Sequence, residues 1–466
     1  MKNYFHFKQV DTDTFLITND FGKYQFVPRE AFARFASGQI EMGDPLYDIL
    51  HQNLFLLEPA DLYAPDTSFV LRDMKQYVFG ATSLHIFVVT NNCNLQCVYC
   101  QAQAHQHHQA SRGFMTPETA RKAVDIALQS PANSLTFEFQ GGEPLLNFPA
   151  IREIVTYAEK QRGQKQISYT LVSNLSLLTE EMLDFFILHH VSISTSLDGP
   201  QKLHDQNRPH SGGKSSHALM QSGAERIHAC GYSLGGIETT TRQSLGMAKE
   251  IVQAYLELGC YGIFLRPLTP LGFAADAWAD IGYTPDEFLA FYREAFTEIL
   301  QINRTGMIFP ELHATIFLRK IICSSGGNYM DLRSPCGAGI GQLAYYYDGS
   351  IYTCDEARMV AESGDPAFLL GNVDTHSYRD LIRSPGCKAV CTASVTESLP
   401  GCCDCVYQPY CGTCPVVNYA SHGDIFPKGT ADYRCRIYSG MLDYLFSLLR
   451  ENDPEIMGIL NSWVEG

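Results

Sequence analysis

The sequence predicts an α/β protein built around a partial barrel of six strand–helix units. A small strand-rich unit precedes the barrel and a cysteine-rich region follows it. Between residues 84 and 268, apolar strand patterns alternate with amphipathic helix patterns, which is typical of a parallel sheet. Ten of the 16 cysteines lie between residues 336 and 435. The length of 466 residues accommodates about three such units.

The N-terminal unit is predicted from short strands and turn residues. We expect strands over residues 5–7, 14–18 and 24–27, a turn over 19–22, and helices over 29–36 and 45–53. Pro28 suits the start of the first helix, because proline lacks the N–H that a first helical turn leaves unpaired. The unit is too short to be an enzyme, so it is either a recognition element or a structural cap.

The barrel is predicted from six strand patterns, at residues 84–90, 135–139, 168–172, 191–197, 237–241 and 263–268. The helices between them are expected at residues 117–128, 149–160, 180–189, 217–229 and 248–258. Six units suit a partial barrel better than a closed eight-stranded one. A bridging helix over 285–302 and a closing helix over 441–450 follow. The predicted domains are therefore 1–78, 79–310, 311–440 and 441–466.

Composition excludes several classes of protein. A net charge of −16 argues against nucleic-acid binding, and no apolar stretch approaches the 18 residues of a membrane span. The N-terminus has no long apolar run after a basic start, so we expect no signal peptide and a cytoplasmic protein. In that setting the cysteines are expected to ligate metal rather than form disulfides. The polar run with His105, His107 and His108 is expected to be a loop without a metal role.

Three cysteines, Cys93, Cys97 and Cys100, follow the first predicted barrel strand with the spacing C-x3-C-x2-C. Three thiolates on one loop can hold three irons of a [4Fe–4S] cube and leave the fourth iron open for chemistry. The second strand ends in Gly141-Gly142-Glu143-Pro144. Because functional groups gather at the carboxyl ends of parallel strands, the two loops are expected to face one another.

These two loops, with Tyr99 before the last cysteine, resemble the signature of radical S-adenosylmethionine (radical SAM) enzymes. The resemblance implies a [4Fe–4S] cluster that binds SAM, with the Gly-Gly-Glu-Pro loop and Tyr99 at the cofactor. The next strand ends offer side chains suited to ribose hydroxyls, although turn chemistry is an alternative. An arginine after the fifth strand could pair with the methionyl carboxylate, or simply be solvated. These residues are Ser173, Asn174, Ser196, Asp198 and Arg242.

The C-terminal cysteines resemble the SPASM domain, which carries two auxiliary [4Fe–4S] clusters in peptide- and protein-modifying enzymes. The resemblance assigns one cluster to Cys402, Cys405, Cys411 and Cys435, and the other to Cys336, Cys354 and Cys414. The spacing of Cys411 and Cys414 is one residue shorter than usual, and Cys403 competes with Cys402. Cys323, Cys387 and Cys391 are candidates for the missing fourth ligand, as is an open site. The alternative is a zinc ribbon on residues 402, 405, 411 and 414.

The whole arrangement resembles peptide maturases with cyclophane-forming and anaerobic sulfatase-maturing relatives. The stretches at residues 14–20, 84–90 and 264–268 most resemble maturases of His-Xaa-Ser-type systems. In such enzymes the N-terminal unit is winged-helix-like and binds a leader peptide by adding a strand. The resemblance implies cleavage of SAM to a 5′-deoxyadenosyl radical, which removes a side-chain hydrogen from a precursor peptide. Asp355 is the implied proton acceptor, with a structural hydrogen bond as the alternative role. Flavodoxin or ferredoxin is the implied electron donor. Alternatives are a sulfatase-type maturase, an enzyme making a cofactor from a small precursor, and a zinc or cluster scaffold without turnover.

Overall fold

The computed structural model describes residues 1–61, 65–104, 113–325, 327 and 329–465, and the His105–His108 run lies outside them. Among these residues, nine strands form the main sheet, in the order β12-β11-β10-β4-β5-β6-β7-β8-β9. The run from β4 to β9 is parallel throughout, which confirms the predicted partial barrel. Its strands are β4 (Leu84–Thr90), β5 (Ser134–Gly141), β6 (Gln166–Val172), β7 (Ser192–Ser196), β8 (Gly235–Thr239) and β9 (Phe264–Arg266).

The cysteine-rich region extends this sheet, which the strand pattern did not predict. β10 (Gln342–Tyr345) pairs in parallel with β4. β11 (Ser350–Tyr352) and β12 (Leu369–Asn372) follow in antiparallel order. The region that carries Cys336 and Cys354 is therefore joined to the first barrel strand by backbone hydrogen bonds.

Both faces of the barrel strands carry apolar side chains, because both faces of the sheet are covered by other parts of the chain. In β4, Phe87 and Val89 pack with the surrounding helices, whereas Ile86 and Val88 belong to a second core shared with the C-terminal region. Alternation of side chains across a strand produces this division. The surrounding helices are α5 (Pro117–Leu128), α6 (Phe148–Gln161), α7 (Glu180–Leu188), α8 (Gln201–Asn207), α9 (Ser216–Ala229), α10 (Ala248–Glu257) and α13 (Pro285–Arg304).

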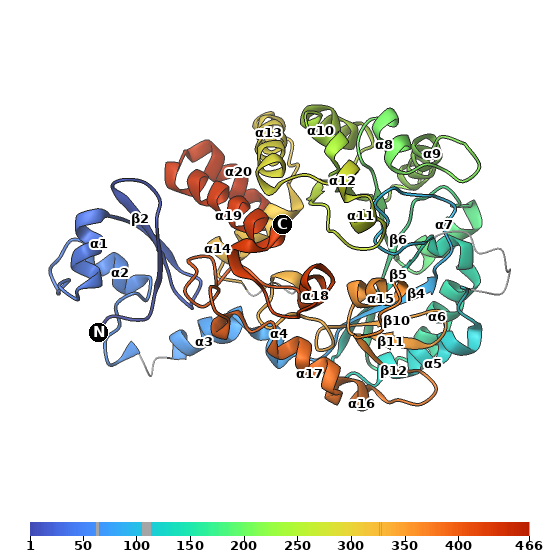
Figure 1. Cartoon of the computed structure of the whole chain (residues 1–466), viewed down its shortest axis with the longest axis horizontal. Coiled ribbons are helices and arrows are strands. Elements are labelled where there is room, and N and C mark those ends of the chain that lie inside the picture. Colours follow the sequence, from blue (N-terminus) through green and yellow to red (C-terminus); the bar gives the residue numbers. More distant parts are fainter. Residues whose placement is uncertain (62–64, 105–112, 326, 328, 466) are drawn as a thin grey trace.

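The N-terminal unit is a three-stranded antiparallel sheet with helices on it. Its elements are β1 (His6–Gln9), β2 (Thr14–Thr18), β3 (Tyr24–Pro28), α1 (Arg29–Ala36), α2 (Tyr47–Gln52), α3 (Pro65–Met74) and α4 (Gln76–Phe79). Figure 1 shows this sheet at one end of the molecule, with C-terminal elements between it and the barrel. The Thr18 hydroxyl donates to the Val406 carbonyl at 2.7 Å, so the unit is held directly against the cysteine-rich segment.

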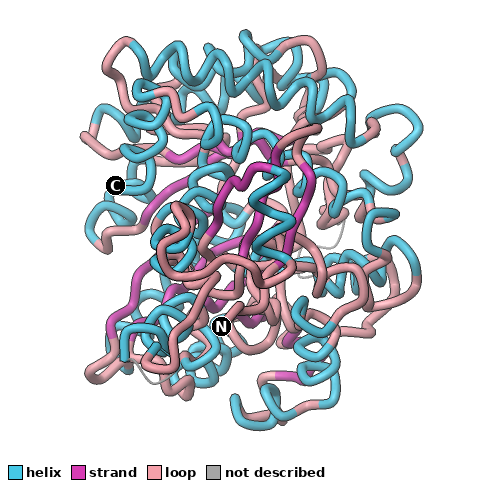
Figure 2. Tube along the Cα trace, turned by 90° about the vertical axis from the view of Figure 1, so that its left-hand side faces the viewer, coloured by secondary structure: helices cyan, strands magenta, loops and turns pink. Residues whose placement is uncertain are grey.

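The C-terminal region is largely helical, and its last part differs from the prediction. α19 (Tyr433–Glu451) begins eight residues before the predicted closing helix, and α20 (Pro454–Glu465) follows it. Figure 2 shows helices and loops surrounding the strands of the sheet. None of the helices in the described ranges is long and apolar enough to cross a membrane. The remaining helices are α11 (Phe273–Asp276), α12 (Trp278–Ile281), α14 (Leu312–Ile322), α15 (Asp355–Glu362), α16 (Tyr378–Arg383), α17 (Pro385–Thr392) and α18 (Pro415–His422).

Candidate active site

The loop after β4 gathers the three cysteines of the first motif. Cys93 is buried, and Cys97 and Cys100 are half-buried. Burial raises the pKa of the Cys93 thiol well above its usual range, and the neighbouring Cys97 thiol raises it further. Burial likewise raises the pKa of Cys97 to about 12, with Cys100 contributing. The three sulfur groups lie close enough to oppose one another's ionisation. A cationic iron centre would stabilise them as thiolates, so this set of donors fits a cluster.

The Gly-Gly-Glu-Pro loop lies directly on the cysteine loop. The Gly142 N–H donates to the Thr90 carbonyl at 2.9 Å, and the Glu143 N–H donates to the Asn92 carbonyl at 2.8 Å. A Cβ on Gly141 would lie 2.3 Å from the Thr90 oxygen, and one on Gly142 would lie 2.3 Å from the Asn92 oxygen. Both glycines are therefore required by the close approach of two backbones, and the predicted proximity of the two loops is observed.

Glu143 joins three parts of this edge. Its buried carboxylate accepts hydrogen bonds from the Ser173 hydroxyl at 2.7 Å, from the Asn174 N–H at 2.8 Å and from the Leu145 N–H at 3.0 Å. Burial raises the pKa of Glu143 to about 7, although these donors oppose the shift. Pro144 begins a short 3-10 helix directly after it. Glu143, Ser173 and Asn174 therefore form one connected unit between β5 and β6.

Two predicted cofactor residues, Tyr99 and Asp198, lie in a buried ion-pair cluster. The Tyr99 hydroxyl donates to the Asp198 carboxylate at 2.6 Å. The Arg208 guanidinium donates to both oxygens of the same carboxylate, at 3.1 and 3.2 Å, and lies 5.2 Å from the centre of the Tyr99 ring. Asp198 is fully buried, and its contacts join the end of β7 to the cysteine loop.

The remaining predicted cofactor residues differ in exposure. Ser196 is half-buried at the end of β7. Arg242 is exposed in a short 3-10 helix beyond β8, where its charge lowers the pKa of Glu287 only as the last of several causes. The sequence did not predict a partner for Arg208, because its pairing with Asp198 depends on how α8 folds back over the strand ends.

A cavity of 460 Å³ occupies the interior of the partial barrel. It is lined by Glu138 and Gln140 of β5, by Arg266 of β9, and by Asp355 and Glu356 at the start of α15. Asp355, the predicted proton acceptor, is buried and accepts a hydrogen bond from the Arg358 Nε at 2.8 Å. It therefore lies at the cavity wall with one oxygen already paired.

Comparison with known proteins identifies the domain that holds these loops. Residues 87–257 match the model of the radical SAM superfamily. Residues 87–257 form a radical SAM domain. The chain is 23% identical over 367 residues to a serine-type anaerobic sulfatase-maturating enzyme of Bacteroides thetaiotaomicron, covering 74% of this chain and 85% of that one. An uncharacterized protein of Methanocaldococcus jannaschii is 30% identical over 40% of this chain, and the match spans 62% of its length.

Solved structures of radical SAM enzymes share the fold. The structure of anSMEcpe with bound AdoMet has a TM-score of 0.68 at 20% identity, and covers 82% of this chain and 99% of its own. Streptococcus suis SuiB bound to its precursor peptide SuiA has a TM-score of 0.56 at 14% identity, and covers 93% of this chain and all of its own. The radical SAM domain implies a [4Fe–4S] cluster and SAM, and marks the chain as an enzyme of the radical SAM type.

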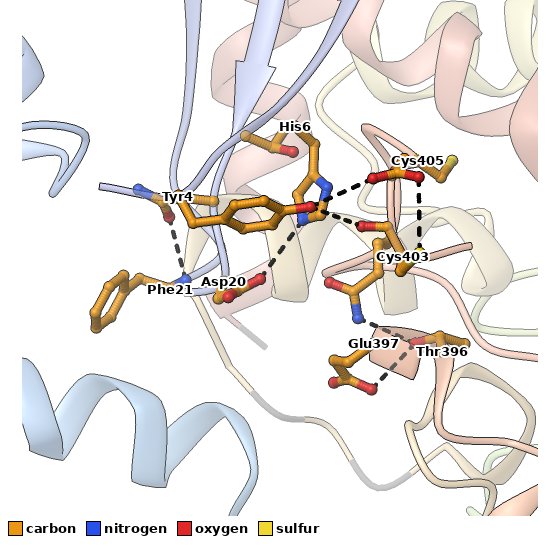
Figure 3. Close-up of polar contacts among 12 residues, drawn as sticks. Tyr4, His6, Asp20, Phe21, Thr396, Glu397, Cys403 and Cys405 are labelled. Carbon is orange, nitrogen blue, oxygen red and sulfur yellow. Dashed lines mark hydrogen bonds and ion pairs between the residues drawn. The ribbon is translucent and has the colours of Figure 1, made fainter. Parts of the chain in front are cut away.

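Outside the radical SAM domain, four cysteines line a second cavity. A cavity of 550 Å³ is lined by Cys402, Cys405, Cys411 and Cys435. Cys403 is not part of this lining. Its backbone carbonyl instead accepts a hydrogen bond from the Tyr4 hydroxyl at 3.2 Å, and Figure 3 shows Tyr4 pointing at this segment from the N-terminal unit. Cys402 therefore shares this cavity with Cys405, Cys411 and Cys435, and Cys403 does not.

The other three cysteines form a separate buried group. Cys336, Cys354 and Cys414 are each buried, and the pKa of Cys354 is raised by burial, by Glu356, and then by Cys414 and Cys336. Cys414 therefore neighbours Cys336 and Cys354, whereas Cys435 lines the cavity with the other three cysteines. Cys387 and Cys391 contact one another on α17, and Cys323 is exposed.

No group of three or more His, Cys, Asp or Glu side chains in the described ranges converges tightly enough for a single metal ion.

Proposed function

We propose that this chain is a radical SAM peptide maturase. In this proposal it reductively cleaves SAM and uses the 5′-deoxyadenosyl radical to remove a side-chain hydrogen from a ribosomally made precursor peptide. The product is an oxidised peptide, such as one with a crosslink or ring. The carrying observation is the hydrogen-bonded contact between the cysteine loop and the Gly-Gly-Glu-Pro loop, whose strand β5 also lines the barrel cavity through Glu138 and Gln140.

The chain's own residues bind the reacting molecules, orient them and limit the access of water. When bound, the cluster on Cys93, Cys97 and Cys100 supplies the electron that cleaves SAM. The glycine loop brings backbone groups within reach of the methionyl end, and Glu143 keeps the ends of β5 and β6 in register beside it. The walls of the barrel cavity limit the access of water to the reacting carbon.

Two further cysteine sets support an oxidative outcome. Hydrogen removal leaves a substrate radical, and loss of one electron and one proton completes a two-electron oxidation. The sets Cys402/Cys405/Cys411/Cys435 and Cys336/Cys354/Cys414 would hold auxiliary clusters that accept the electron. Asp355, on the cavity wall directly after Cys354, would accept the proton.

The N-terminal unit supports a peptide substrate. A three-stranded antiparallel sheet with helices packed on it is a unit to which an extended leader peptide can add a strand. It is held against the cysteine-rich segment by the Thr18–Val406 hydrogen bond, so a bound leader would direct the core peptide toward the barrel. SuiB, whose structure was solved with a precursor peptide, shares the fold over 93% of this chain. Flavodoxin or ferredoxin in the cytoplasm would supply the electron.

A sulfatase-type maturase is the second candidate, because the sulfatase-maturating enzyme of Bacteroides thetaiotaomicron aligns with 74% of this chain. The two functions differ in product. A sulfatase-type reaction leaves an aldehyde on a protein, whereas the proposed reaction joins two positions of a small peptide. A non-catalytic scaffold differs from both because it would not cleave SAM.

Anaerobic reconstitution followed by product analysis tests the proposal. We expect about twelve irons and matching sulfide per chain, and 5′-deoxyadenosine formation with dithionite and SAM. Alanine at Cys93, Cys97 and Cys100 together should abolish that product and retain about eight irons. Co-expression with a small peptide encoded nearby should yield a peptide lighter by two hydrogens. Zinc without sulfide, or 5′-deoxyadenosine from the triple variant, would overturn the proposal.

A further inference from the structure

Arg266 occupies the point where two cavities of the molecule meet. It is the last residue of β9, at the carboxyl edge of the sheet where the cysteine loop also lies. It lines both the 460 Å³ barrel cavity and a neighbouring 130 Å³ cavity that reaches α18 and α19. Its half-buried side chain is therefore within reach of a molecule in either cavity.

The guanidinium of Arg266 has no ion-pair partner within 4.0 Å and makes no side-chain hydrogen bond among the residues that the structure describes. The other buried arginines of this region are paired. Arg208 binds Asp198, Arg358 binds Asp355, and Arg434 binds Asp331 at 2.7 Å. A guanidinium with five donors and no protein acceptor must bond to water or to a ligand that supplies acceptor oxygens.

The nearby acidic groups do not supply that acceptor. The Asp331 carboxylate is paired with Arg434. Glu356 lines the same two cavities and interacts with Arg266 electrostatically, but not at ion-pair distance. Two further carboxylates line the barrel cavity, and both have other partners: Asp355 accepts a hydrogen bond from Arg358, and Glu138 accepts from the Gln140 amide and the Thr170 hydroxyl. The donors of the Arg266 guanidinium are therefore available to an incoming carboxylate.

The walls of the junction favour an organic anion over a small inorganic one. The Phe264 and His313 rings stack with centres 5.0 Å apart, and Tyr329 lies beside them. Both ring nitrogens of buried His313 lack a hydrogen-bond partner within the described part of the chain. Burial lowers the pKa of His313 to about 3, so the ring is neutral and adds no competing positive charge.

The junction is also adjacent to the cysteine loop. Gln101, which follows Cys100, lines the smaller cavity together with Arg266. The chain after β9 packs on that loop, because the Phe273 N–H donates to the Cys100 carbonyl at 3.0 Å. A Cβ on Gly272 would lie 2.3 Å from the Gln101 oxygen. A group held by Arg266 would therefore lie close to the reacting centre.

We propose that Arg266 binds a carboxylate in the barrel cavity and so positions the molecule that carries it. The inference rests on the proposed function, and two molecules could bring the carboxylate: an acidic side chain or C-terminus of the substrate peptide, or the methionyl end of SAM. Guanidinium and carboxylate match as a bidentate pair, which sets orientation as well as affinity. Lysine at this position would keep the positive charge but lose the paired N–H donors of the guanidinium.

The test uses reconstituted holoenzyme carrying Arg266→Gln, Arg266→Lys or the matched surface change Arg383→Gln. Iron content is measured first. Calorimetry then measures binding of SAM and of decarboxylated SAM, and binding of N-acetyl-aspartate N-methylamide against its asparagine analogue in the presence of SAM. A fragment of this size should bind wild type in the millimolar range.

If the peptide supplies the carboxylate, wild type should prefer the aspartate probe to the asparagine probe at least tenfold. Arg266→Gln should abolish that preference and leave SAM affinity within twofold, and Arg266→Lys should retain part of it. If SAM supplies the carboxylate, Arg266→Gln should weaken SAM at least tenfold and decarboxylated SAM hardly at all. Either pattern supports the proposal.

Equal behaviour of wild type and Arg266→Gln toward all four probes would overturn it. If Arg266→Gln loses iron, the test is decided by Arg266→Lys, whose preference between the paired probes is compared with that of the wild type. Failure of the proposed function gives a different result from failure of this inference: the wild-type enzyme then makes no 5′-deoxyadenosine, whatever its preference between the carboxylate probes.

Discussion

At the scale of single residues, the Asp198 carboxylate accepts hydrogen bonds from a phenol and a guanidinium within the core. Both donors lie beside the cysteine loop, since Tyr99 is part of it and Arg208 covers the Tyr99 ring. A buried carboxylate with both oxygens engaged is stabilising only while its partners remain. The cluster therefore holds the loop in the geometry that the thiols need.

Replacing Tyr99 by phenylalanine should lower the free energy of unfolding by about 1.5–3 kcal/mol, because a hydrogen bond to a buried charged group is lost. Denaturant unfolding of the apoprotein measures the change. Tyr157→Phe is the matched control, because the Tyr157 hydroxyl donates to Asp125 at 3.0 Å on the exposed surface. Its expected cost is below about 0.5 kcal/mol. Equal costs for the two variants would contradict a special role for the buried pair.

Glu311 gives the fold a pH dependence. Its buried carboxylate accepts hydrogen bonds from the Leu265, His313 and Ala314 N–H groups and from the Tyr292 hydroxyl. Burial nevertheless raises its pKa to about 7. The folded state then binds a proton more tightly than the unfolded state, whose carboxyl has a pKa near 4.3. Stability from this group is full below that pH and is lost as the pH rises to about 7.

Raising the pH from about 4.5 to 7.5 should therefore cost about 3 kcal/mol through Glu311, an amount set by the pKa difference. Glu311→Gln removes the titrating group, so its unfolding free energy should fall less steeply with pH. Thermal or urea unfolding of apoprotein at several pH values gives both slopes. Identical slopes for variant and wild type would show that Glu311 has an ordinary pKa in the folded protein.

At the scale of elements, the contact between the two loops depends on having no side chain at Gly142. Alanine there would place a methyl group 2.3 Å from the Asn92 oxygen, which is backbone and cannot rotate away. We expect Gly142→Ala to cost about 1–3 kcal/mol of stability and to weaken SAM binding at least tenfold. Calorimetry on reconstituted enzyme measures the affinity.

Gly458→Ala serves as its counterpart. Gly458 lies within α20, and a Cβ there would meet nothing within 4 Å. Alanine should stabilise that helix by about 0.5–1 kcal/mol and leave SAM binding unchanged. If both glycine variants bind SAM as wild type does, the loop contact has no role in cofactor binding.

The barrel elements were predictable because their signals are local. β4 and α5 match their predicted bounds, since an apolar run and a capped amphipathic pattern each lie within a dozen residues. β8 begins two residues earlier than predicted, because Gly235 and Gly236 pair with β7 although glycine carries no strand signal. β10 was missed, because its pairing with β4 joins segments some 250 residues apart in the chain.

The candidate site shows the same division. The spacing of Cys93, Cys97 and Cys100 and the glycine pair at residues 141 and 142 predict a shared edge, because one strand separates them. The pairing of Arg208 with Asp198 and the unpaired Arg266 could not be predicted. Which arginine faces a carboxylate and which faces a cavity is decided by tertiary packing, and the sequence carries no pattern for it.

At the scale of the whole molecule, the N-terminal sheet and the cysteine-rich segment share one core. The Phe446 ring of α19 lies between them, with ring centres 5.3 Å from Tyr24, 5.9 Å from Tyr407 and 5.6 Å from Tyr410. The Tyr410 hydroxyl also donates to the Gly22 carbonyl at 3.2 Å. A leader-binding unit joined in this way would sense the state of the cysteine-rich segment directly.

Phe446→Ala should remove this shared packing at a cost of about 3–5 kcal/mol. Because Tyr407 and Tyr410 lie between Cys405 and Cys411, we expect the variant to lose about four of twelve irons on reconstitution. The cluster on the radical SAM domain should remain, so 5′-deoxyadenosine still forms without peptide. Phe426→Ala, at a ring that is 43% exposed, should keep full iron. A Phe446 variant that is destabilised yet keeps all its iron would show that the N-terminal sheet and the cysteine cavity are energetically independent.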